Sequence, residues 1–363
     1  MKKVGIITLN GNFNYGNRLQ NYALQQALKG LNVFSETISF ADTHKMNKSI
    51  EIIYKIKYKI MRFIKNDSKA VLDWEKMKLA KEKVFQPFTE KNIKSIQVRR
   101  DVDISSEFDY FIVGSDQVWN PNIIGNDTSY FLDFTSKQKR IAYAASFGIP
   151  ELSNASGSFK SGLLGMNKVS VRENSGADIV KQITGNKPQV VVDPTMLLSA
   201  KKWKQLAHQY SNDIDTDGKY ILIYFLRDKS EQLYKDIKTY AESKGYKIYD
   251  IMGDSYNERK IIPNPLQFVS LIEKAEFVLS DSFHCAVFSI IMKTPFTIID
   301  RNSGNMNSRI QTLLSKFNLE NNRYDNGAKF DFIRRNTDFS NVDNILDEEK
   351  KIGLLFLKNA LKQ

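Results

Sequence analysis

His284 is the residue of this sequence best placed to transfer a proton in a reaction. Residues 276–292 read EFVLSDSFHCAVFSIIM, a short apolar run, then polar residues, then an almost wholly apolar stretch. This pattern predicts a buried strand that ends at Ser280, with Asp281 or Ser282 capping a buried helix. His284 then lies in the first helical turn, where the helix N-terminus favours an anion beside the imidazole. We therefore predict a functional site at His284.

Arginines occur at two further positions suited to anion binding. Arg172 follows the apolar run VSV, and Arg309 stands in the sequence NSRI, in a predicted loop before a leucine-rich helix. A guanidinium forms paired hydrogen bonds to phosphate or carboxylate. Asp193 follows the run VVV in the same arrangement as Arg172, with an acid in place of the arginine. For Arg172, a pairing role and a ligand role both remain open.

The turn NGNFNYGN at residues 10–17 is a candidate for ligand binding. It follows the first predicted strand, includes Asn14 and Asn17, and runs into a helix. Its glycines let a ligand come close to the backbone, and the helix start offers free amides. It lacks the G-x-G-x-x-G spacing and the G-K-[ST] ending. The sequence therefore does not support a dinucleotide site or a P-loop.

A second polar turn follows the apolar strand predicted at residues 110–114. Three polar residues stand at its carboxyl end: Ser115, Asp116 and Gln117. In open α/β sheets, ligands bind at this edge. Trp119 is either a stacking wall for a sugar ring or a core residue.

Two series of short apolar runs alternate with helical stretches, which predicts an α/β protein with two doubly wound domains. The length of 363 residues also favours two domains. We place the boundary near residue 205, giving domains of 1–205 and 206–363, with the polar stretch 211–218 as linker. The predicted strands are 4–9, 33–40, 110–114, 140–146, 168–171, 189–192, 220–225, 247–252, 276–280 and 296–299.

The positive charge of the chain is concentrated in one segment of the first domain. Overall, 53 Lys and Arg stand against 41 Asp and Glu, a net charge of +12. Residues 44–100 hold 16 basic and six acidic residues, a net charge of +10. We predict that this basic insert is helical, with helices at 52–65 and 71–85, the second ended by Pro87.

The first of these helices is amphipathic. Its isoleucines share one arc of about 120°, flanked by Lys55, Lys59 and Arg62. Such a face packs against its own domain or lies on an anionic membrane surface, and we favour its own domain for the isoleucines themselves. A lysine-rich patch also attracts nucleic acid. No recognition motif is present, so we expect no nucleic-acid partner.

The rest of the composition excludes several classes of protein. The lone Cys285 rules out a disulfide framework and a four-thiolate metal site, and we interpret it as a core residue. No His/Asp/Glu spacing suggests a metal site. No stretch of about 18 apolar residues occurs, and the short apolar start is not a signal peptide. We expect a soluble, cytoplasmic protein.

Together these motifs resemble the polysaccharide pyruvyl transferase family. The resemblance spans residue 1 to about residue 320 outside the basic insert, and its motifs occur in the family's order. They are the first turn, FDYFIVGSDQVWNP, YFLDF, RIAYAASFG, VSVRE, VVVDPTMLL, FVLSDSFHCAVFSIIMKTPF and NSRIQTLL. The family implies two Rossmann-like domains facing a cleft, in a glycosyltransferase-B-like (GT-B-like) architecture.

The resemblance also implies a reaction. Such enzymes move pyruvate from phosphoenolpyruvate onto two hydroxyls of a sugar in a surface-polysaccharide precursor, with no cofactor. His284 is then the acid/base. Arg172, Arg309 and Ser282 are donor-binding candidates, although many members have an arginine in place of Ser282. The acceptor side includes Asn14, Asn17, Ser115, Asp116 and Gln117. If the acceptor is linked to a lipid at the inner face of the membrane, the basic insert would hold the enzyme at that surface as a peripheral protein.

Two alternatives remain open. One is a GT-B-type glycosyltransferase that uses a nucleotide sugar, for which Asp281 and Asp300 are the candidate ribose-binding acids. The other is a non-catalytic binding protein whose basic insert docks to a membrane or to nucleic acid.

Overall fold

The computed structural model describes most of the chain. It covers residues 1–41, 68–152, 157–209, 214, 216, 218–227, 229–251, 260–300, 307–324 and 337–362, with the backbone alone at 68–76, 260 and 307. The predicted amphipathic helix at 52–65 and its flanking lysines lie outside the described residues, as does most of the predicted linker at 211–218.

The first domain is built on a seven-stranded parallel sheet in the order β3-β2-β1-β4-β5-β6-β7. Its central strands are short and almost fully buried, as expected for strands covered on both faces. The strands are β1 (Lys2–Ile7), β2 (Val33–Ala41), β3 (Ser95–Arg99), β4 (Tyr110–Val113), β5 (Arg140–Ala145), β6 (Lys168–Val171) and β7 (Gln189–Val190). Its helices are α1 (Tyr15–Gly30), α3 (Ser68–Asn92), α4 (Pro121–Ile124), α5 (Gly157–Leu164), α6 (Asn174–Thr184) and α7 (Ala200–His208), with 3₁₀ turns η1 (Thr128–Phe131), η2 (Lys137–Lys139) and η3 (Pro194–Leu197).

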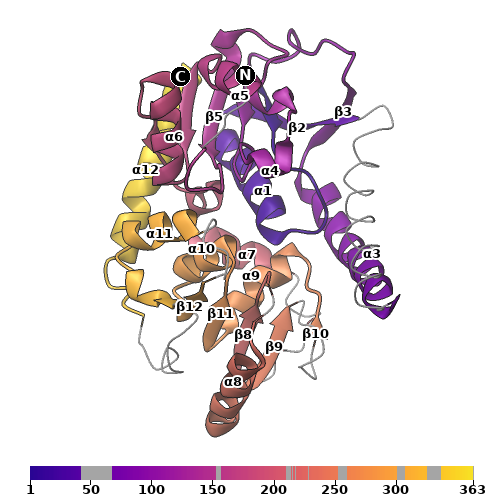
Figure 1. Cartoon of the computed structure of the whole chain (residues 1–363), viewed down its shortest axis with the longest axis vertical. Helices are drawn as coiled ribbons and strands as arrows, with labels where there is room; N and C mark the ends of the chain where they lie inside the picture. The colour runs from indigo at the N-terminus through magenta and orange to yellow at the C-terminus, as the bar shows by residue number, and fades with distance from the viewer. Residues whose placement is uncertain are drawn as a thin grey trace.

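The second domain repeats the design with a six-stranded parallel sheet in the order β10-β9-β8-β11-β12-β13. Its strands are β8 (Tyr220–Tyr224), β9 (Lys247–Ile251), β10 (Lys260–Ile261), β11 (Phe277–Ser280), β12 (Phe296–Ile299) and β13 (Arg323–Tyr324). Its helices are α8 (Glu231–Lys244), α9 (Pro265–Lys274), α10 (Phe283–Met292) and α11 (Asn307–Lys316), with the 3₁₀ turn η6 (Glu320–Asn322). The two doubly wound α/β units predicted from the apolar runs are therefore present (Figure 1).

Two predictions for the basic insert are wrong. Pro87 does not end the helix, because α3 continues to Asn92. Phe85 and Phe88 are buried in the core on either side of Pro87, and this packing outweighs the lost backbone hydrogen bond. The insert is also not helical to residue 100. Its last part is the edge strand β3, which pairs with β2 and whose alternating, partly exposed pattern lacks a continuous apolar run.

The two domains share one buried apolar cluster. Tyr15 of α1 stacks on Phe268 of α9 with ring centroids 4.4 Å apart, and Trp203 of α7 meets the edge of Phe288 of α10 at 5.1 Å. In Figure 1, α9, α10 and α7 lie between the two sheets. The predicted boundary at residue 205 falls inside α7, a helix that packs against α9.

The last helix, α12 (Val342–Ala360), runs from the second domain back to the first (Figure 1). Lys293, which follows α10, pairs with Asp343 near the start of α12. Near the end of α12, the ring centroid of Phe356 lies 6.0 Å from that of Tyr143 in the first domain. The Nζ atom of Lys2 donates to the carbonyl oxygen of Lys362 at 2.9 Å, so the two ends of the chain meet.

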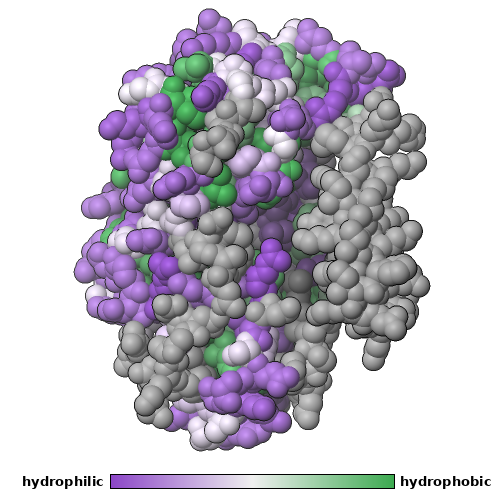
Figure 2. Space-filling view, in the orientation of Figure 1, coloured by the Kyte–Doolittle hydropathy of each residue, from purple (hydrophilic) through white to green (hydrophobic). Residues whose placement is uncertain are grey.

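The face of the molecule seen in Figure 2 is mostly hydrophilic, with apolar residues in small separate groups. In the described part of the chain, we find no helix with the length and apolar character needed to cross a membrane.

Candidate active site

The predicted functional residues meet where the carboxyl ends of the two sheets face each other. In the first domain, Asp116 follows β4, Arg172 follows β6 and Asp193 follows β7. In the second domain, His284 stands in the first turn of α10, just after β11. All four side chains are buried. The carboxyl edge of a parallel sheet is the usual ligand-binding edge of this fold class, and here two such edges contribute to one cluster.

Local sequence fixes the start of α10. Ser282 is the N-cap, and its Oγ accepts a hydrogen bond from the backbone N–H of Cys285 at 3.5 Å. The backbone N–H of Ser282 donates to Oγ of Ser280 at 3.0 Å. Every residue of the helix is buried, as its uniform apolar character predicts. His284 therefore enters the cluster on a rigid, fully packed helix.

His284 lies between two elements of the first domain. A Cβ atom added at Gly16, in the first turn of α1, would lie 1.9 Å from Nδ1 of His284. Only glycine at this position lets α1 come so close to the imidazole ring. On the other side, Nε2 of His284 lies 3.4 Å from Oδ2 of Asp193, which is an ion-pair distance. Nε2 is buried and makes no hydrogen bond in this geometry.

Asp193 is the most heavily bonded carboxylate of the cluster. Its Oδ2 accepts from Nη1 of Arg172 at 2.8 Å and from Oγ of Ser115 at 3.1 Å. Its Oδ1 accepts from the backbone N–H of Thr195 at 3.1 Å and from the Thr195 hydroxyl at 2.8 Å. Burial alone would raise the pKa of Asp193, but its interactions with His284 and Arg172 hold the pKa well below its ordinary value. The group is a fixed negative charge beside the imidazole.

Arg172 and Arg309 approach the same aromatic ring from different domains. The guanidinium carbon of Arg172 lies 4.2 Å from the centroid of Phe283, and that of Arg309 lies 5.9 Å from it. Burial lowers the pKa of Arg172, but Asp193 and Asp116 raise it further, so it lies above its ordinary value. Arg309 stands in the first turn of α11, so the prediction that it lies in a loop is wrong.

Asp116 completes the cluster. Its Oδ1 lies 3.4 Å from Nη2 of Arg172, and its φ of +73° is in a region that residues other than glycine rarely adopt. Burial raises the pKa of Asp116, but the nearby cations, Arg172 first among them, outweigh burial and bring the pKa below its ordinary value. Backbone strain of this kind is concentrated at functional sites.

The other predicted acceptor residues make internal hydrogen bonds. Asn14 caps α1 by accepting from the backbone N–H of Asn17 at 3.2 Å, and Asn17 in turn accepts from Nη2 of Arg18 at 2.6 Å. Oγ of Ser115 contacts Asp193, as described above. Oε1 of Gln117 accepts from Nδ2 of Asn120 at 2.8 Å. These side chains shape the loops around the cluster.

The structure places two further side chains named in the sequence analysis, Trp119 and Cys285. Trp119 is fully buried and stacks on Phe131 with ring centroids 5.9 Å apart, so it is a core residue. Cys285 is fully buried, and burial raises the pKa of its thiol to about 12, so it is not a nucleophile. Within the described ranges, no group of three or more His, Cys, Asp or Glu is arranged to hold a metal ion.

Two buried cations were missed by the sequence analysis. Arg18 in α1 is buried beside Asn10, whose Oδ1 accepts from Nη2 of Arg18 at 3.0 Å, and burial lowers the pKa of Arg18 to about 10. Lys229 follows β8, with a side chain only 2% exposed. Its Nζ donates to the carbonyl oxygen of Asp300 at 3.0 Å and lies 3.5 Å from Oδ2 of Asp281. For Lys229, its position shortly after the strand predicted at 220–225 was the available signal, whereas Arg18 lies inside a helix and had no such signal.

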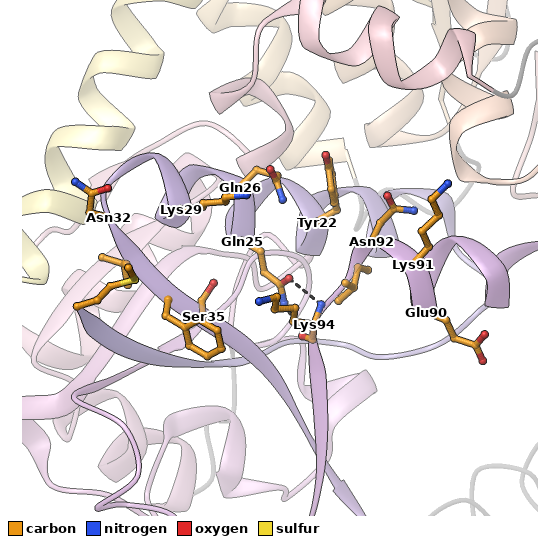
Figure 3. A pocket seen from close by; sticks show the side chains of 14 residues that line it. Tyr22, Gln25, Gln26, Lys29, Asn32, Ser35, Glu90, Lys91, Asn92 and Lys94 are labelled. Carbon is orange, nitrogen blue, oxygen red and sulfur yellow. Dashed lines mark hydrogen bonds between the residues drawn. The ribbon is translucent and has the colours of Figure 1, made fainter.

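A separate pocket of about 640 Å³ lies at the opposite edge of the first sheet, where β2 and β3 begin (Figure 3). In this pocket the buried side-chain amide of Gln25 already has hydrogen-bond partners within the protein. Its Oε1 accepts from the backbone N–H of Lys94 at 3.0 Å, and its Nε2 donates to the carbonyl oxygen of Lys94 at 2.7 Å. This pocket is not part of the cluster around His284.

Comparison with known proteins identifies the family. The sequence matches the family described as polysaccharide pyruvyl transferase over residues 14–303, which include His284, Arg172 and Asp193. The chain belongs to the polysaccharide pyruvyl transferase family. It is accordingly a transferase, and the resemblance inferred from its motifs is confirmed. Arg309 lies just beyond the matched range. No curated protein matches the chain significantly.

Solved structures confirm the fold of this pyruvyl transferase family member. UDP-GlcNAc 2-epimerase from Methanocaldococcus jannaschii is 13% identical, with a TM-score of 0.51 over 97% of this chain and 92% of that chain. The Neisseria meningitidis epimerase bound to UDP-GlcNAc is 12% identical, with a TM-score of 0.50 over 100% and 98%. S. aureus MnaA with UDP is 12% identical, with a TM-score of 0.51 over 98% and 91%. At this identity the likeness shows the fold alone, which is α/β and GT-B-like.

Proposed function

We propose that this transferase moves pyruvate from phosphoenolpyruvate onto two hydroxyls of one sugar in a surface-polysaccharide precursor, forming a cyclic ketal. The observation that carries the proposal is the meeting of His284 with Asp193 of the other domain, 3.4 Å apart. A histidine beside a fixed carboxylate is suited to donate and accept protons. Family membership supports pyruvyl transfer in general. The donor, the acceptor and the roles of residues are our proposal.

In the proposed reaction, protonated His284 donates a proton to C3 of phosphoenolpyruvate, and C2 becomes electrophilic. A first sugar hydroxyl attacks C2 and returns its proton to His284. The C2–O bond to phosphate then breaks, with the electron pair leaving on phosphate. A second hydroxyl of the same sugar attacks C2 and gives its proton to the departing phosphate. The products are the pyruvate ketal and hydrogen phosphate, and His284 is restored.

The donor carries a phosphate and a carboxylate, and we assign their binding to the two arginines beside Phe283. Arg309 is one of them. Arg172 contributes Nη2, which lies 3.4 Å from Asp116, longer than a good hydrogen bond, and is therefore available for exchange to the donor. Ser282 is already the cap of α10, so we assign it to positioning His284.

A donor must reach a ring nitrogen of His284 to take its proton. In this structure the two nitrogens face Gly16 and Asp193, both of the first domain. We therefore propose that the two domains separate to admit the donor and close on it. Closure would exclude water while the reactive C2 centre exists.

We further propose that the acceptor is linked to a lipid at the cytoplasmic face of the membrane. This part rests on the charge of +10 in residues 44–100. Replacing Lys55, Lys59 and Arg62 with Gln should weaken sedimentation with vesicles containing phosphatidylglycerol and leave phosphoenolpyruvate affinity unchanged. Unchanged sedimentation would leave the segment without a membrane role.

The glycosyltransferase alternative is not favoured by the contacts of its candidate acids. Asp300 is held by Arg323, whose Nε and Nη2 both donate to it at 2.8 Å. Oδ1 of Asp281 accepts from the backbone N–H of Leu226 at 2.7 Å, and its Oδ2 faces Lys229. Both carboxylates are engaged inside the second domain, so neither is placed to bind ribose hydroxyls.

The role of His284 is tested by His284→Asn, which keeps a polar side chain but cannot transfer a proton at neutral pH. We expect phosphate release from phosphoenolpyruvate, in the presence of p-nitrophenyl glycosides as acceptors, to fall about 100-fold or more. Calorimetric affinity for phosphoenolpyruvate should change only a few-fold. Equal phosphate release by the variant and the wild type would show that His284 is not the acid/base.

A further inference from the structure

We propose that Phe13, between β1 and α1, is the surface on which a pyranose ring of the sugar acceptor stacks. This inference rests on the proposed function and names the acceptor contact of the same site. Phe13 is 57% exposed, although it belongs to the turn that leads into the active-site helix α1. Its position follows the carboxyl end of β1, at the edge where α/β sheets bind ligands.

The polar side chains of this turn have internal partners. Nδ2 of Asn10 donates to Oγ of Ser39 at 2.9 Å. Oδ1 of Asn12 accepts from the hydroxyl of Thr89 at 2.8 Å. Asn14 caps α1. Asn10 is exposed as well, but its side chain is engaged in hydrogen bonds, so we take the ring of Phe13 as the group that the turn presents to an acceptor.

One contact fixes the backbone of Phe13 and another supports its ring. The carbonyl oxygen of Phe13 accepts from Nζ of Lys81 at 3.3 Å, and Lys81 is a buried residue of α3. A Cβ atom added at Gly11 would lie 2.2 Å from Cε1 of Phe13, so the ring rests directly on the backbone of Gly11. A fixed ring loses little conformational entropy when a ligand stacks on it, and this distinguishes Phe13 from an ordinary exposed apolar residue.

The ring also lies close in sequence to the chemistry. Gly16, three residues after Phe13, is the residue against which the His284 ring packs. The helix α1 between them is rigid, because Asn14 caps it and Tyr15 stacks on Phe268. An aromatic face attracts the C–H groups of a sugar ring through burial of apolar surface and through its quadrupole. A sugar held on Phe13 would then be bound by the turn that leads into the helix packed on the acid/base.

The test measures glycoside binding directly. Saturation-transfer NMR would follow p-nitrophenyl β-D-glucoside, β-D-galactoside and α-D-mannoside with the full-length wild type, Phe13→Ala and Phe13→Trp. Loss of one stacking contact should weaken glycoside affinity about 3- to 10-fold in Phe13→Ala. Phe13→Trp should retain it. Leu164→Ala is the matched control, because Leu164 is 52% exposed on α5, and it should bind like the wild type.

Turnover gives the second readout. In Phe13→Ala the KM for the glycoside should rise, while kcat and phosphoenolpyruvate affinity stay near the wild-type values. The inference is overturned if the wild type binds none of the glycosides, if Phe13→Ala binds them equally, or if Phe13→Ala loses only binding to anionic vesicles. If Phe13 determines glycoside binding but no pyruvate is transferred, the stacking surface stands and the proposed reaction fails.

Discussion

The Nε2 atom of His284 and the Oδ2 atom of Asp193 lie 3.4 Å apart, and the two residues belong to different domains. Asp193 is fixed in the first domain by Arg172, Ser115 and Thr195. His284 is fixed in the second by the fully buried helix α10. The cluster is therefore complete only when the domains meet, and neither half holds both the imidazole and its carboxylate.

Replacing Gly16 with Ala should disable the enzyme while leaving it folded. The new methyl group would lie 1.9 Å from Nδ1 of His284, so the imidazole or α1 must move. A displacement of about 1 Å at the acid/base costs on the order of 100-fold in rate. Phosphate release at saturating phosphoenolpyruvate measures this loss, and the Tm should fall by only a few degrees because overpacking costs about 1–3 kcal/mol.

Gly30 provides the matched control in the same helix. No atom lies within 4 Å of a Cβ added there, so Gly30→Ala should keep full activity. Its stability should be equal or higher, by up to about 1 kcal/mol, because alanine favours the helix. Equal activity of Gly16→Ala and Gly30→Ala would argue against the close packing of α1 on His284.

Acid should destabilise the wild type more steeply than Asp193→Asn. The folded-state pKa of Asp193 lies below its ordinary value of about 4, so the unfolded chain takes up the proton first as the pH falls. The stability from this group is thus present above about pH 4 and is lost below it, at up to about 1.4 kcal/mol per pH unit. Urea unfolding between pH 6 and pH 3 measures the slope.

Asp193→Asn removes the titrating group, so its unfolding free energy should be lower than that of the wild type at neutral pH and should vary less with acid. Asp178→Asn changes an exposed ion pair with Lys187 and should keep the wild-type slope. A slope for Asp193→Asn as steep as that of the wild type would mean that other groups cause the acid sensitivity.

Lys229→Met should be among the most destabilising substitutions in the second domain. It leaves the carboxylate of Asp281 buried without Lys229, at a cost of about 3–5 kcal/mol. The substitution also removes the hydrogen bond from Lys229 to the carbonyl oxygen of Asp300. Chemical denaturation measures the change, and Lys238→Met, at an exposed pair with Glu242, should differ from the wild type by less than about 0.5 kcal/mol.

The double variant Lys229→Met/Asp281→Asn tests the coupling between the two groups. Removing both charges should recover part of the lost stability, because no buried carboxylate remains. Additive losses would indicate that Lys229 acts mainly through the backbone carbonyls at the end of β12.

Much of the fold could be predicted from the apolar runs. Strands such as β4 and β8 lie where apolar residues form continuous stretches, because parallel strands are buried on both faces. The strands that the sequence analysis missed are β3, β10 and β13, all at or near the sheet edges and short or polar. Their pairing depends on a neighbouring strand and not on their own composition. Pro87 led to a wrong predicted helix end, because core packing of the residues around it keeps α3 helical to Asn92.

The site could be predicted in part. Arg172 and His284 each follow an apolar strand, so each was expected at the carboxyl edge of its own sheet. The contacts of Gly16 and Asp193 with His284 join the two domains, and no local pattern reports how two domains pack. The asparagines of the first turn have the right residue type for sugar binding, but whether they are already bonded depends on α3 and β2.

Arg309→Ala should weaken phosphoenolpyruvate binding about 10- to 100-fold, since a charge-assisted pair to an anion contributes about 1.5–3 kcal/mol. Isothermal titration calorimetry with phosphoenolpyruvate measures this loss. Arg99→Ala is the control, because Arg99 is exposed and pairs with Asp101, its near neighbour in sequence. If Arg309→Ala binds phosphoenolpyruvate like the wild type, the donor anions are held elsewhere.

Deuterium labelling tests the proposed transfer most directly. Wild type and His284→Asn would be incubated in D₂O with phosphoenolpyruvate and a p-nitrophenyl glycoside, and the products followed by ¹H and ³¹P NMR. The wild type should release phosphate and form a ketal whose methyl group carries one deuterium from solvent, whereas His284→Asn should form none. A glycoside that gains no pyruvyl methyl signal with the wild type, or an equal signal with His284→Asn, would contradict His284-dependent pyruvyl transfer.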